Sequence, residues 1–455
     1  MNRVKTLFVC RTCGAETLRW EGRCPTCGEW NSLDEDVRAS GRETRRAASR
    51  TSRVTTLGAS SRSAIDRIDT GFGEVDRVLG GGVVPGSVVL LGGAPGIGKS
   101  TLLLQIAGRI RGSGHDVLYV SGEESAEQVA LRAARLGGSP DVSFLATNDL
   151  DEAILAIRAT EPAVVCVDSV QTLSSASLGT VPGGVAQVRE AAAALQREVK
   201  ASGATCFLVG HVTKGGALAG PRTLEHLVDV VLHFEGQRSG DHRILRGSKN
   251  RFGSVDELAA FRMEAAGLVP VPDPSSLFLT ADGMESSGSA VAIPMHGSRP
   301  VLAEVQALVA RARFSTPQRV CTGFPPRRLA ILLAVLEKKA GVALGDQDVF
   351  LNVVGGLRVA DPAADLAVVA ALLSAGADRP FETGTAFFGE VGLGGEVRPV
   401  SRAEARLRAA ETSSIQSVVV PAGLEAGSQL SSTRVHPVRH VRELAPLMAT
   451  GNGRP

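Results

Sequence analysis

Residues 87–105 read SVVLLGGAPGIGKSTLLLQ, and this stretch decides the fold of the central part of the chain. It joins an apolar run, a glycine-rich turn and an amphipathic stretch, which predicts a buried strand, a loop and a helix in that order. Gly93-x4-Gly98-Lys99-Ser100 matches the spacing of a P-loop in full. A chance glycine turn would lack the strand before it and the helix after it, so the segment predicts a nucleoside triphosphate site.

Phosphate chemistry explains the residue types in this loop. Glycines let backbone N–H groups curve around the β-phosphate, and the helix N-terminus adds its dipole. Lys99 is expected to reach the β- and γ-phosphate oxygens, and Ser100 is expected to ligate Mg²⁺. The predicted ATP-binding residues are Gly93, Ala94, Pro95, Gly96, Ile97, Gly98, Lys99, Ser100 and Thr101.

Three further apolar runs predict strands that end in polar residues. DVLYV precedes Glu123, AVVCVD ends at Asp168, and TCFLVGH ends at His211. An acid at the end of a parallel strand beside a P-loop can hold the Mg²⁺ shell, which favours Asp168 as the Walker B residue. Glu123 is expected to orient and deprotonate the attacking water, and His211 to sense the γ-phosphate. Solvated strand-end acids and a structural histidine are the alternatives.

Strands that alternate with helices predict a parallel, doubly wound α/β sheet with its ligand at the carboxyl ends of the strands. Two long glycine-containing segments follow those ends, at 172–187 and 212–226. Loops of this length inside a compact domain are often functional. Lys214 and Arg222 give the second segment a positive character that suits a DNA backbone.

Four of the seven cysteines lie near the start of the chain, in VCRTCGAETLRWEGRCPTCGEW. Cys10 and Cys13 form one CxxC turn, and Cys24 and Cys27 form another. Two such turns supply the four thiolates that Zn²⁺ prefers, so the spacing predicts a zinc module whose folding depends on the metal. A pair of disulfides is the alternative, but nothing directs the chain to an oxidising compartment.

Composition limits the other classes of function. At 455 residues the chain fits about three domains, and its formal charge of +2 implies no polyanion partner by itself. No apolar run approaches the roughly 20 residues of a membrane span, and no signal peptide is recognisable. We therefore expect a cytoplasmic protein with no membrane partner.

Several motifs together resemble the bacterial RadA family of DNA repair proteins, also called Sms. The motifs are the four-cysteine motif and, after it in the chain, TGFGEVDRVLGGG (70–82), YVSGEES (119–125), GHVTKGGALAGPRTLEHLVD (210–229) and KNRFG (249–253). The resemblance runs over nearly the whole chain. It implies a RecA-like ATPase that forms hexameric rings, binds single-stranded and branched DNA, works with the recombinase RecA and drives branch migration. It also implies that Asp168 is the Walker B residue and Glu123 the catalytic acid.

The KNRFG motif follows HRILRG, which predicts a strand at the far edge of the ATPase sheet. In ring ATPases a cation from the neighbouring subunit stabilises charge on the γ-phosphate. We predict that Lys249 makes this contact, that Arg251 binds a second phosphate or DNA, and that Phe252 fixes the turn. A surface turn with solvated cations is the alternative.

From about residue 285 the sequence resembles the proteolytic domain of Lon proteases, most clearly in GEVGLGGEVRP (389–399). A Ser–Lys dyad needs a hydroxyl and a neutral amine within hydrogen-bond reach. Ala363 and Glu404 stand where that family has the serine and the lysine, so we predict no peptidase activity. Subunit assembly is the expected role, and DNA contact is the second. The cationic candidates, which a solvated face would also explain, are Arg327, Arg328, Lys338 and Lys339.

The chain is therefore expected to have four parts. These are a zinc-binding module (1–33), a basic disordered linker (34–60), a RecA-like P-loop ATPase domain (61–275) and an α+β Lon-protease-like domain (285–455). The predicted function is that of a DNA-dependent ATPase and helicase in recombination and repair. The alternative is an ATP-regulated adaptor that binds recombinase and DNA without translocating, and an ATP-dependent protease is disfavoured.

Overall fold

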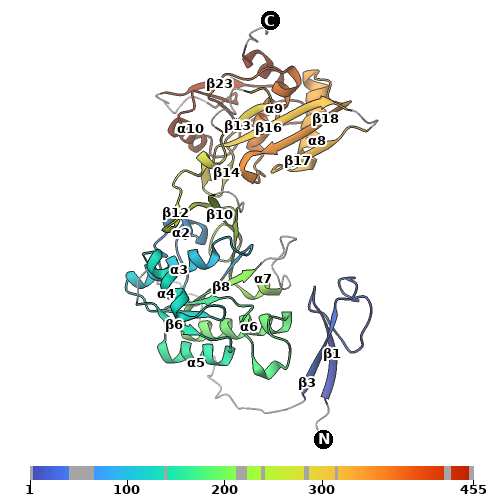
Figure 1. The fold of residues 1–455 in the computed structure, drawn as a ribbon. Coiled ribbons are helices and arrows are strands. Elements are labelled where there is room, and N and C mark those ends of the chain that lie inside the picture. Colours follow the sequence, from blue (N-terminus) through green and yellow to red (C-terminus); the bar gives the residue numbers. More distant parts are fainter. Residues whose placement is uncertain are drawn as a thin grey trace, which may run out of the picture. The chain divides into compact units, whose positions relative to one another are not determined.

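The computed structural model describes residues 4–39, 66–137, 141–211, 223–236, 241–280, 286–312, 316–424 and 432–449. Contacts divide the chain into two compact units, Met1–Pro272 and Asp273–Pro455 (Figure 1). Within the described ranges, no helix is both long and apolar enough to cross a membrane. Lys214, Arg222 and most of the predicted linker lie outside the described residues.

The N-terminal module is a small antiparallel sheet in the order β2-β1-β3. Its strands are β1 (Val4–Cys10), β2 (Glu16–Thr17) and β3 (Leu33–Ala39). Residues 34–39, which the sequence assigns to the linker, instead pair with β1 along its full length, from Val4↔Ala39 to Cys10↔Leu33. The run LDEDVRA has no apolar alternation, so hydrophobic periodicity does not predict this strand.

A nine-stranded sheet forms the body of the first unit, in the order β12-β11-β10-β9-β4-β8-β7-β5-β6. The strands are β4 (Val88–Gly93), β5 (Val117–Ser121), β6 (Ser143–Ala146), β7 (Val164–Asp168), β8 (Thr205–His211), β9 (Val230–Glu235), β10 (His242–Asn250), β11 (Leu258–Glu264) and β12 (Gly267–Pro270). The strands from β9 to β6 are parallel, and β10 to β12 continue the sheet antiparallel. The predicted parallel α/β sheet is confirmed.

Helices cover both faces of this sheet. They are α2 (Gly73–Leu79), α3 (Lys99–Gly112), α4 (Ala126–Arg135), α5 (Leu150–Thr160), α6 (Val185–Ser202) and α7 (Thr223–Leu227), with a short 3₁₀ turn η1 (Ala176–Leu178). Alternate residues of β4 enter different cores: Val89 and Leu91 pack with α2 and α3, whereas Val88 and Leu90 pack with α5 and α6. A strand buried on both faces reads as a continuous apolar run, as β4 does.

The strand that carries KNRFG is not at an edge of the sheet. β10 lies between β9 and β11, and β12 is the outer strand on that side. The prediction of an edge strand is therefore wrong, because the sequence does not reveal that β11 and β12 add to the sheet beyond β10.

The second unit has a seven-stranded sheet in the order β17-β18-β16-β13-β19-β22-β23. Its strands are β13 (Ser289–Ala292), β16 (Ala303–Arg311), β17 (Arg319–Thr322), β18 (Gln347–Val353), β19 (Thr385–Phe387), β22 (Ser417–Pro421) and β23 (Arg434–Val438). Two small pairs stand apart from it, β14 (Met295–His296) with β15 (Arg299–Pro300) and β20 (Glu390–Val391) with β21 (Val397–Arg398).

The helices of this unit are α8 (Pro326–Val335), which continues as a π-helical turn η4 (Leu336–Ala340), α9 (Asp365–Ala377) and α10 (Ala403–Thr412). Short 3₁₀ turns are η2 (Pro274–Leu277), η5 (Val354–Gly356), η6 (Pro362–Ala364) and η7 (Val441–Leu447). Every residue of α9 from Asp365 to Ser374 is buried. A helix that is apolar on all sides forms the centre of a core, and α9 does so here.

Two aspartates flank the position of the expected serine, and both are held in ion pairs. Asp361 Oδ2 lies 2.8 Å from Nη2 of Arg406, which is 1% exposed. Asp365 is fully buried, pairs with Arg328 and accepts a hydrogen bond from the backbone N–H of Val391 at 3.2 Å. For Arg328, one of the cationic candidates, the alternative of a solvated face is therefore wrong, because its charge neutralises a buried carboxylate.

We expect Arg406→Ala to lower the free energy of unfolding of the second unit by about 3–5 kcal/mol, because it removes one partner of a buried ion pair. Arg408→Ala on the same helix is the matched control. Arg408 is 72% exposed and pairs with Glu404, so its loss should cost less than about 1 kcal/mol. Urea unfolding of the full chain measures both, and similar losses for the two variants would contradict the structural role of Arg406.

Candidate functional site

The glycine loop joins β4 to α3 at the carboxyl end of the parallel strands. Gly96 and Gly98 have φ values of 75° and 111°, in the left-handed region that favours glycine. A Cβ on Gly98 would also lie 2.7 Å from Cε of Met263. The loop leads directly into α3, whose first backbone N–H groups have no acceptor inside the helix. This cradle of N–H groups fits a phosphate.

Lys99 is the first residue of α3 and is 4% exposed. Its Nζ donates hydrogen bonds to the carbonyl oxygens of Gly93 at 2.9 Å and Ala94 at 3.0 Å. Burial lowers the pKa of Lys99, and the nearby charges of Asp168 and Glu123 oppose that shift. The structure thus brings the lysine and both predicted acids to the same end of the sheet.

Asp168 ends β7 and is 8% exposed. The phenol of Tyr119 donates a hydrogen bond of 2.8 Å to its Oδ2. Burial raises the pKa of Tyr119 well above its usual value, and the charge of Asp168 raises it further. The phenol therefore stays protonated at neutral pH and holds one oxygen of the carboxylate in place.

Glu123 follows β5, the strand next to β7 in the sheet. The hydroxyl of Ser169 donates a hydrogen bond of 2.8 Å to Glu123 Oε1, and Ser169 is 1% exposed. The Asp168–Ser169 peptide bond is cis. Ser169, the residue after one predicted acid, thus holds the other by its hydrogen bond.

Three residues at this site are absent from the prediction made from sequence. Tyr119 and Ser169 orient the two acids, and the buried Arg243 of β10 donates a hydrogen bond of 2.9 Å to the carbonyl oxygen of Ile97 in the glycine loop. One signal was available for Tyr119: it is the sole tyrosine of the chain, in an otherwise aliphatic strand. A buried phenol needs a hydrogen-bond partner, but the partner depends on strand register.

The other predicted residues of the nucleotide site lie around the loop. Ser100 and Thr101 occupy the first turn of α3, Ile97 is buried, and Pro95 is exposed. His211 closes β8, and its side chain lies outside the described part of the structure.

KNRFG lies at the opposite end of the sheet from the glycine loop. Lys249 and Asn250 pair with Val231 and Val230 at the start of β9, which runs parallel to β4. Val231 and Val230 pair in turn with Leu90 and Val89, so the glycine loop begins three to four residues further along β4, or about 10–13 Å away at the usual rise of a strand. Strand β9 also separates β10 from β4, and Lys249 Nζ is held by carbonyl oxygens at the far end, so within one chain Lys249 does not reach its own P-loop.

The polar side chains of KNRFG bind neighbouring backbone carbonyls. Lys249 Nζ donates to the carbonyl oxygens of Glu225 at 2.5 Å and Val228 at 2.7 Å, at the C-terminal end of α7. Asn250 Nδ2 donates to Val78 and Leu79 at 3.3 Å and 3.2 Å, at the end of α2. Both side chains thus satisfy carbonyl groups that a helix C-terminus leaves without partners.

Arg251 pairs with Asp229 at 2.9 Å, and the aspartate is 5% exposed whereas the arginine is 51% exposed. The other oxygen of Asp229 accepts a hydrogen bond of 3.1 Å from the backbone N–H of Val88, the first residue of β4. Phe252 packs against the core beneath α2 and α3. The motif is therefore fixed to the start of the strand that carries the P-loop.

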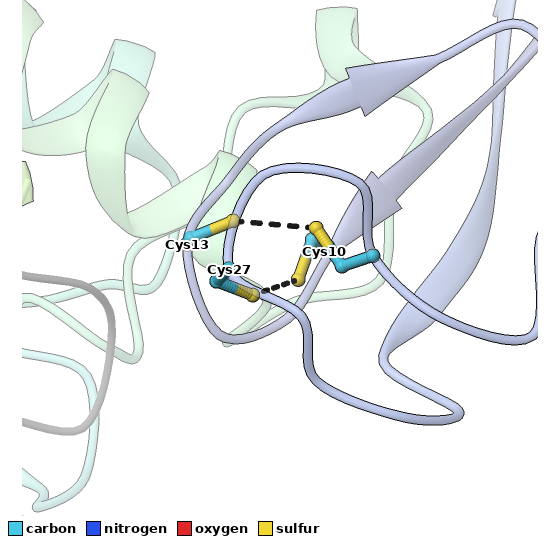
Figure 2. Close-up of side chains that lie close together, drawn as sticks. Cys10, Cys13 and Cys27 are labelled. Carbon is cyan, nitrogen blue, oxygen red and sulfur yellow. Dashed lines mark hydrogen bonds between the residues drawn. The ribbon is translucent and has the colours of Figure 1, made fainter.

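The four N-terminal cysteines form a candidate metal centre (Figure 2). The Sγ atoms lie 3.6 Å apart in both the Cys10–Cys27 and the Cys13–Cys24 pair, and all four are within 4.8 Å of one another. Tetrahedral Zn–S bonds of about 2.3 Å place sulfurs about 3.8 Å apart, so the four thiolates fit zinc. All seven cysteines are free thiols, which rules against the alternative of two disulfides.

We expect one zinc ion per chain, and we expect Cys24→Ser to release it, because a thiolate is lost from a four-sulfur shell. Cys321→Ser is the control, since Cys321 is half-buried and hydrogen-bonds the carbonyl oxygen of Phe324 away from this cluster. Metal analysis of freshly purified protein measures the content. Full zinc content in Cys24→Ser, or none in the unmodified protein, would contradict the assignment.

Three family models match parts of the chain. Residues 8–35 match a rubredoxin metal binding domain, residues 53–217 an AAA domain, and residues 330–423 the subunit ChlI of Mg-chelatase. The first match covers the cysteine centre and the second covers the P-loop, so they support zinc and ATP as the bound groups. The chain combines a RecA-like P-loop ATPase core with a four-cysteine zinc module and a Lon-protease-like C-terminal domain.

Curated relatives match over nearly the full length. DNA repair protein RadA of Bacillus subtilis is 46% identical over 93% of this chain and 93% of its own. RadA of Pseudomonas aeruginosa is 49% identical over 93% and 94%, and RadA of Aquifex aeolicus is 43% identical over 97% and 99%. At this identity over this length, and with the P-loop, the KNRFG motif and the cysteine centre in place, the chain belongs to the RadA family of DNA repair proteins.

Proposed function

We propose that the chain is a DNA-dependent ATPase and helicase of homologous recombination and DNA repair, which drives branch migration of recombination intermediates along single-stranded DNA. The observation that supports this most is the meeting of Lys99, Asp168 and Glu123 at the carboxyl end of one parallel sheet. The names of the relatives support a role in DNA repair.

In this proposal, residues 93–101 bind the triphosphate through backbone N–H groups, and Lys99 stabilises charge on its β- and γ-phosphate oxygens. Ser100 and Asp168 would hold Mg²⁺, which neutralises phosphate charge when bound. Glu123 accepts a proton from the attacking water. The buried Tyr119 and Ser169 keep the two carboxylates oriented by donating hydrogen bonds to them.

Lys249 is proposed to act on the nucleotide of the neighbouring subunit, with Arg251 at a second phosphate or at DNA. The distance between KNRFG and the P-loop of the same chain supports an action between subunits, since the two lie at opposite ends of β4. Burial lowers the pKa of Lys249, and the nearby charge of Arg251 lowers it further. A partly desolvated ammonium of this kind gains more from an anionic partner than a solvated one would.

The remaining parts follow the same proposal. The ATPase domain (61–275) would assemble into a hexameric ring that binds single-stranded and branched DNA and works with RecA. The Lon-like domain would serve assembly without peptidase chemistry, because Ala363 is fully buried and Glu404 is 76% exposed and paired with Arg408. Among the cationic candidates outside the buried ion pair, Arg327 and Lys338 are exposed.

Strand separation of a forked DNA duplex with ATP and Mg²⁺ tests the proposal. We expect the unmodified protein to separate the strands, and Lys99→Ala to lower both separation and ATP hydrolysis by about 100-fold or more, because a buried phosphate charge loses its cation. Lys200→Ala, an exposed lysine on α6, should change neither. DNA-stimulated hydrolysis without strand separation would favour the adaptor instead.

A mixing experiment tests the action of Lys249. Lys249→Ala should bind ATP yet lose DNA-stimulated hydrolysis, because the neighbouring γ-phosphate lacks its cation. Mixing it with Lys99→Ala subunits should give more turnover than the two variants show separately, since some interfaces then join an intact P-loop to an intact Lys249. Normal hydrolysis by Lys249→Ala alone with single-stranded DNA would refute this role.

A further inference from the structure

The N-terminal module exposes both tryptophans of the chain. Trp20 is 57% exposed and Trp30 is 67% exposed, and Leu18 beside them is 75% exposed. The buried core of the module consists of Cys10, Cys24 and Leu33, with Phe8, Cys13 and Ala15 partly buried around it. The largest side chains of the module therefore contribute to its surface instead of its core, which indicates a binding role for that surface.

The two indole rings meet at a residue that has no side chain. A Cβ placed on Gly22 would lie 3.8 Å from Cζ3 of Trp30 and 4.0 Å from Cη2 of Trp20. Both rings thus border one small space between them. A larger residue at position 22 would fill that space, so glycine leaves facing parts of the two rings accessible.

A guanidinium extends this aromatic surface. The Cζ atom of Arg23 lies 5.8 Å from the centre of the Trp30 ring, within the range of a cation–π contact. Its Nε donates a hydrogen bond of 2.7 Å to the carbonyl oxygen of Gly28, which fixes its position. An isolated β-bridge between Arg23 and Trp30 holds the backbone of the same hairpin. The flat groups are therefore pre-positioned by the fold around the cysteines.

The charges around these rings favour one kind of ligand. Arg19 and Arg23 are exposed next to Trp20 and Trp30, and Glu21 and Glu29 are exposed in the same hairpin. An apolar protein face would have to desolvate these four charges to reach the rings. An unpaired base can stack on the face of an indole while the neighbouring charged groups stay hydrated. The phosphates of the same strand would then lie near the arginines.

We propose that Trp20, Trp30 and Arg23 form a stacking site for unpaired bases of single-stranded DNA. Base–aromatic stacking tolerates any sequence because every base has a flat π-face, whereas the bases of a duplex already stack on one another. The site lies outside the ATPase domain and requires neither ATP nor Lys249. It deepens the proposed function, on whose DNA substrate it rests, by adding a contact to single strands in the zinc module.

Intrinsic fluorescence tests this site directly, because all tryptophan emission of the full chain comes from Trp20 and Trp30. We expect an oligothymidylate of about 30 nucleotides to quench that emission in the absence of ATP, and a duplex of the same length to leave it unchanged. Zinc content of each protein, measured in parallel, shows that the module is folded.

Affinity for the labelled oligothymidylate, measured by anisotropy, identifies the contacts. Trp20→Ala and Trp30→Ala should each weaken binding by about 10-fold, the size expected for one stacked base. Trp30→Phe should recover most of that loss and Trp30→Leu should not, because leucine keeps the apolar bulk and lacks a π-face. Leu18→Ala, a neighbour of similar exposure without a ring, should bind as the unmodified protein does.

Three outcomes would overturn the proposal, and the first two leave the proposed function intact. If the oligothymidylate binds but tryptophan emission does not change, the stacking site is wrong while DNA binding elsewhere in the chain stands. If Trp30→Leu binds as well as Trp30→Phe, the rings serve as apolar bulk and not as stacking surfaces. If no single-stranded DNA binds at all, the stacking site and the proposed DNA substrate both fail.

Discussion

The parallel register of β4 between β8 and β9 is the constraint on which the nucleotide site depends. It places Gly93, the last residue of β4, opposite His211 of β8 and Phe234 of β9. Because β5 and β7 run in the same direction, Glu123 and Asp168 emerge at the same end of the sheet as the P-loop. The reversal at β10 then carries KNRFG back to the other end. One chain thus separates Lys249 from its own nucleotide site, which is the arrangement that the proposed action between subunits requires.

The KNRFG motif has a structural role that any catalytic role must accommodate. Lys249 and Asn250 satisfy the last carbonyls of α7 and α2, and Arg251 neutralises the buried Asp229. Hydrogen bonds from a charged donor contribute about 1.5–3 kcal/mol each, so Lys249 can leave its two carbonyls only for a strongly anionic partner. A γ-phosphate meets that condition, and water does not. If Lys249 bound the γ-phosphate of a neighbouring subunit, it would leave the carbonyl oxygens at the end of α7, and that end of the helix would lose these two hydrogen bonds.

Residue spacing within a short segment was sufficient to predict the P-loop and the cysteine cluster. The features that were missed depend on strand pairing and on contacts between residues far apart in the sequence. The P-loop and the paired CxxC turns are each complete within about twenty residues, so their geometry could be derived from sequence. The Tyr119–Asp168 bond spans 49 positions and depends on the register of β5 with β7. The place of β10 inside the sheet and the Arg328–Asp365 pair, 37 positions apart, depend likewise on packing. Strand β3 was missed because its pairing with β1 shows no apolar alternation.

In the Lon-like domain, apolar packing and ion pairs surround Ala363, the position where we expect the serine of Lon proteases. Ala363 lies in an apolar cluster with Leu302, Phe388 and Leu407, so a serine there would bury a hydroxyl at a cost of about 1–3 kcal/mol unless it found a partner. No amine is available at position 404, where an exposed carboxylate pairs with Arg408. Asp361 and Asp365, on either side, have their charges balanced by Arg406 and Arg328. A serine at position 363 alone would therefore add a buried polar group without a base to activate it. The apolar cluster around that position would become less stable, and the serine would not become a nucleophile.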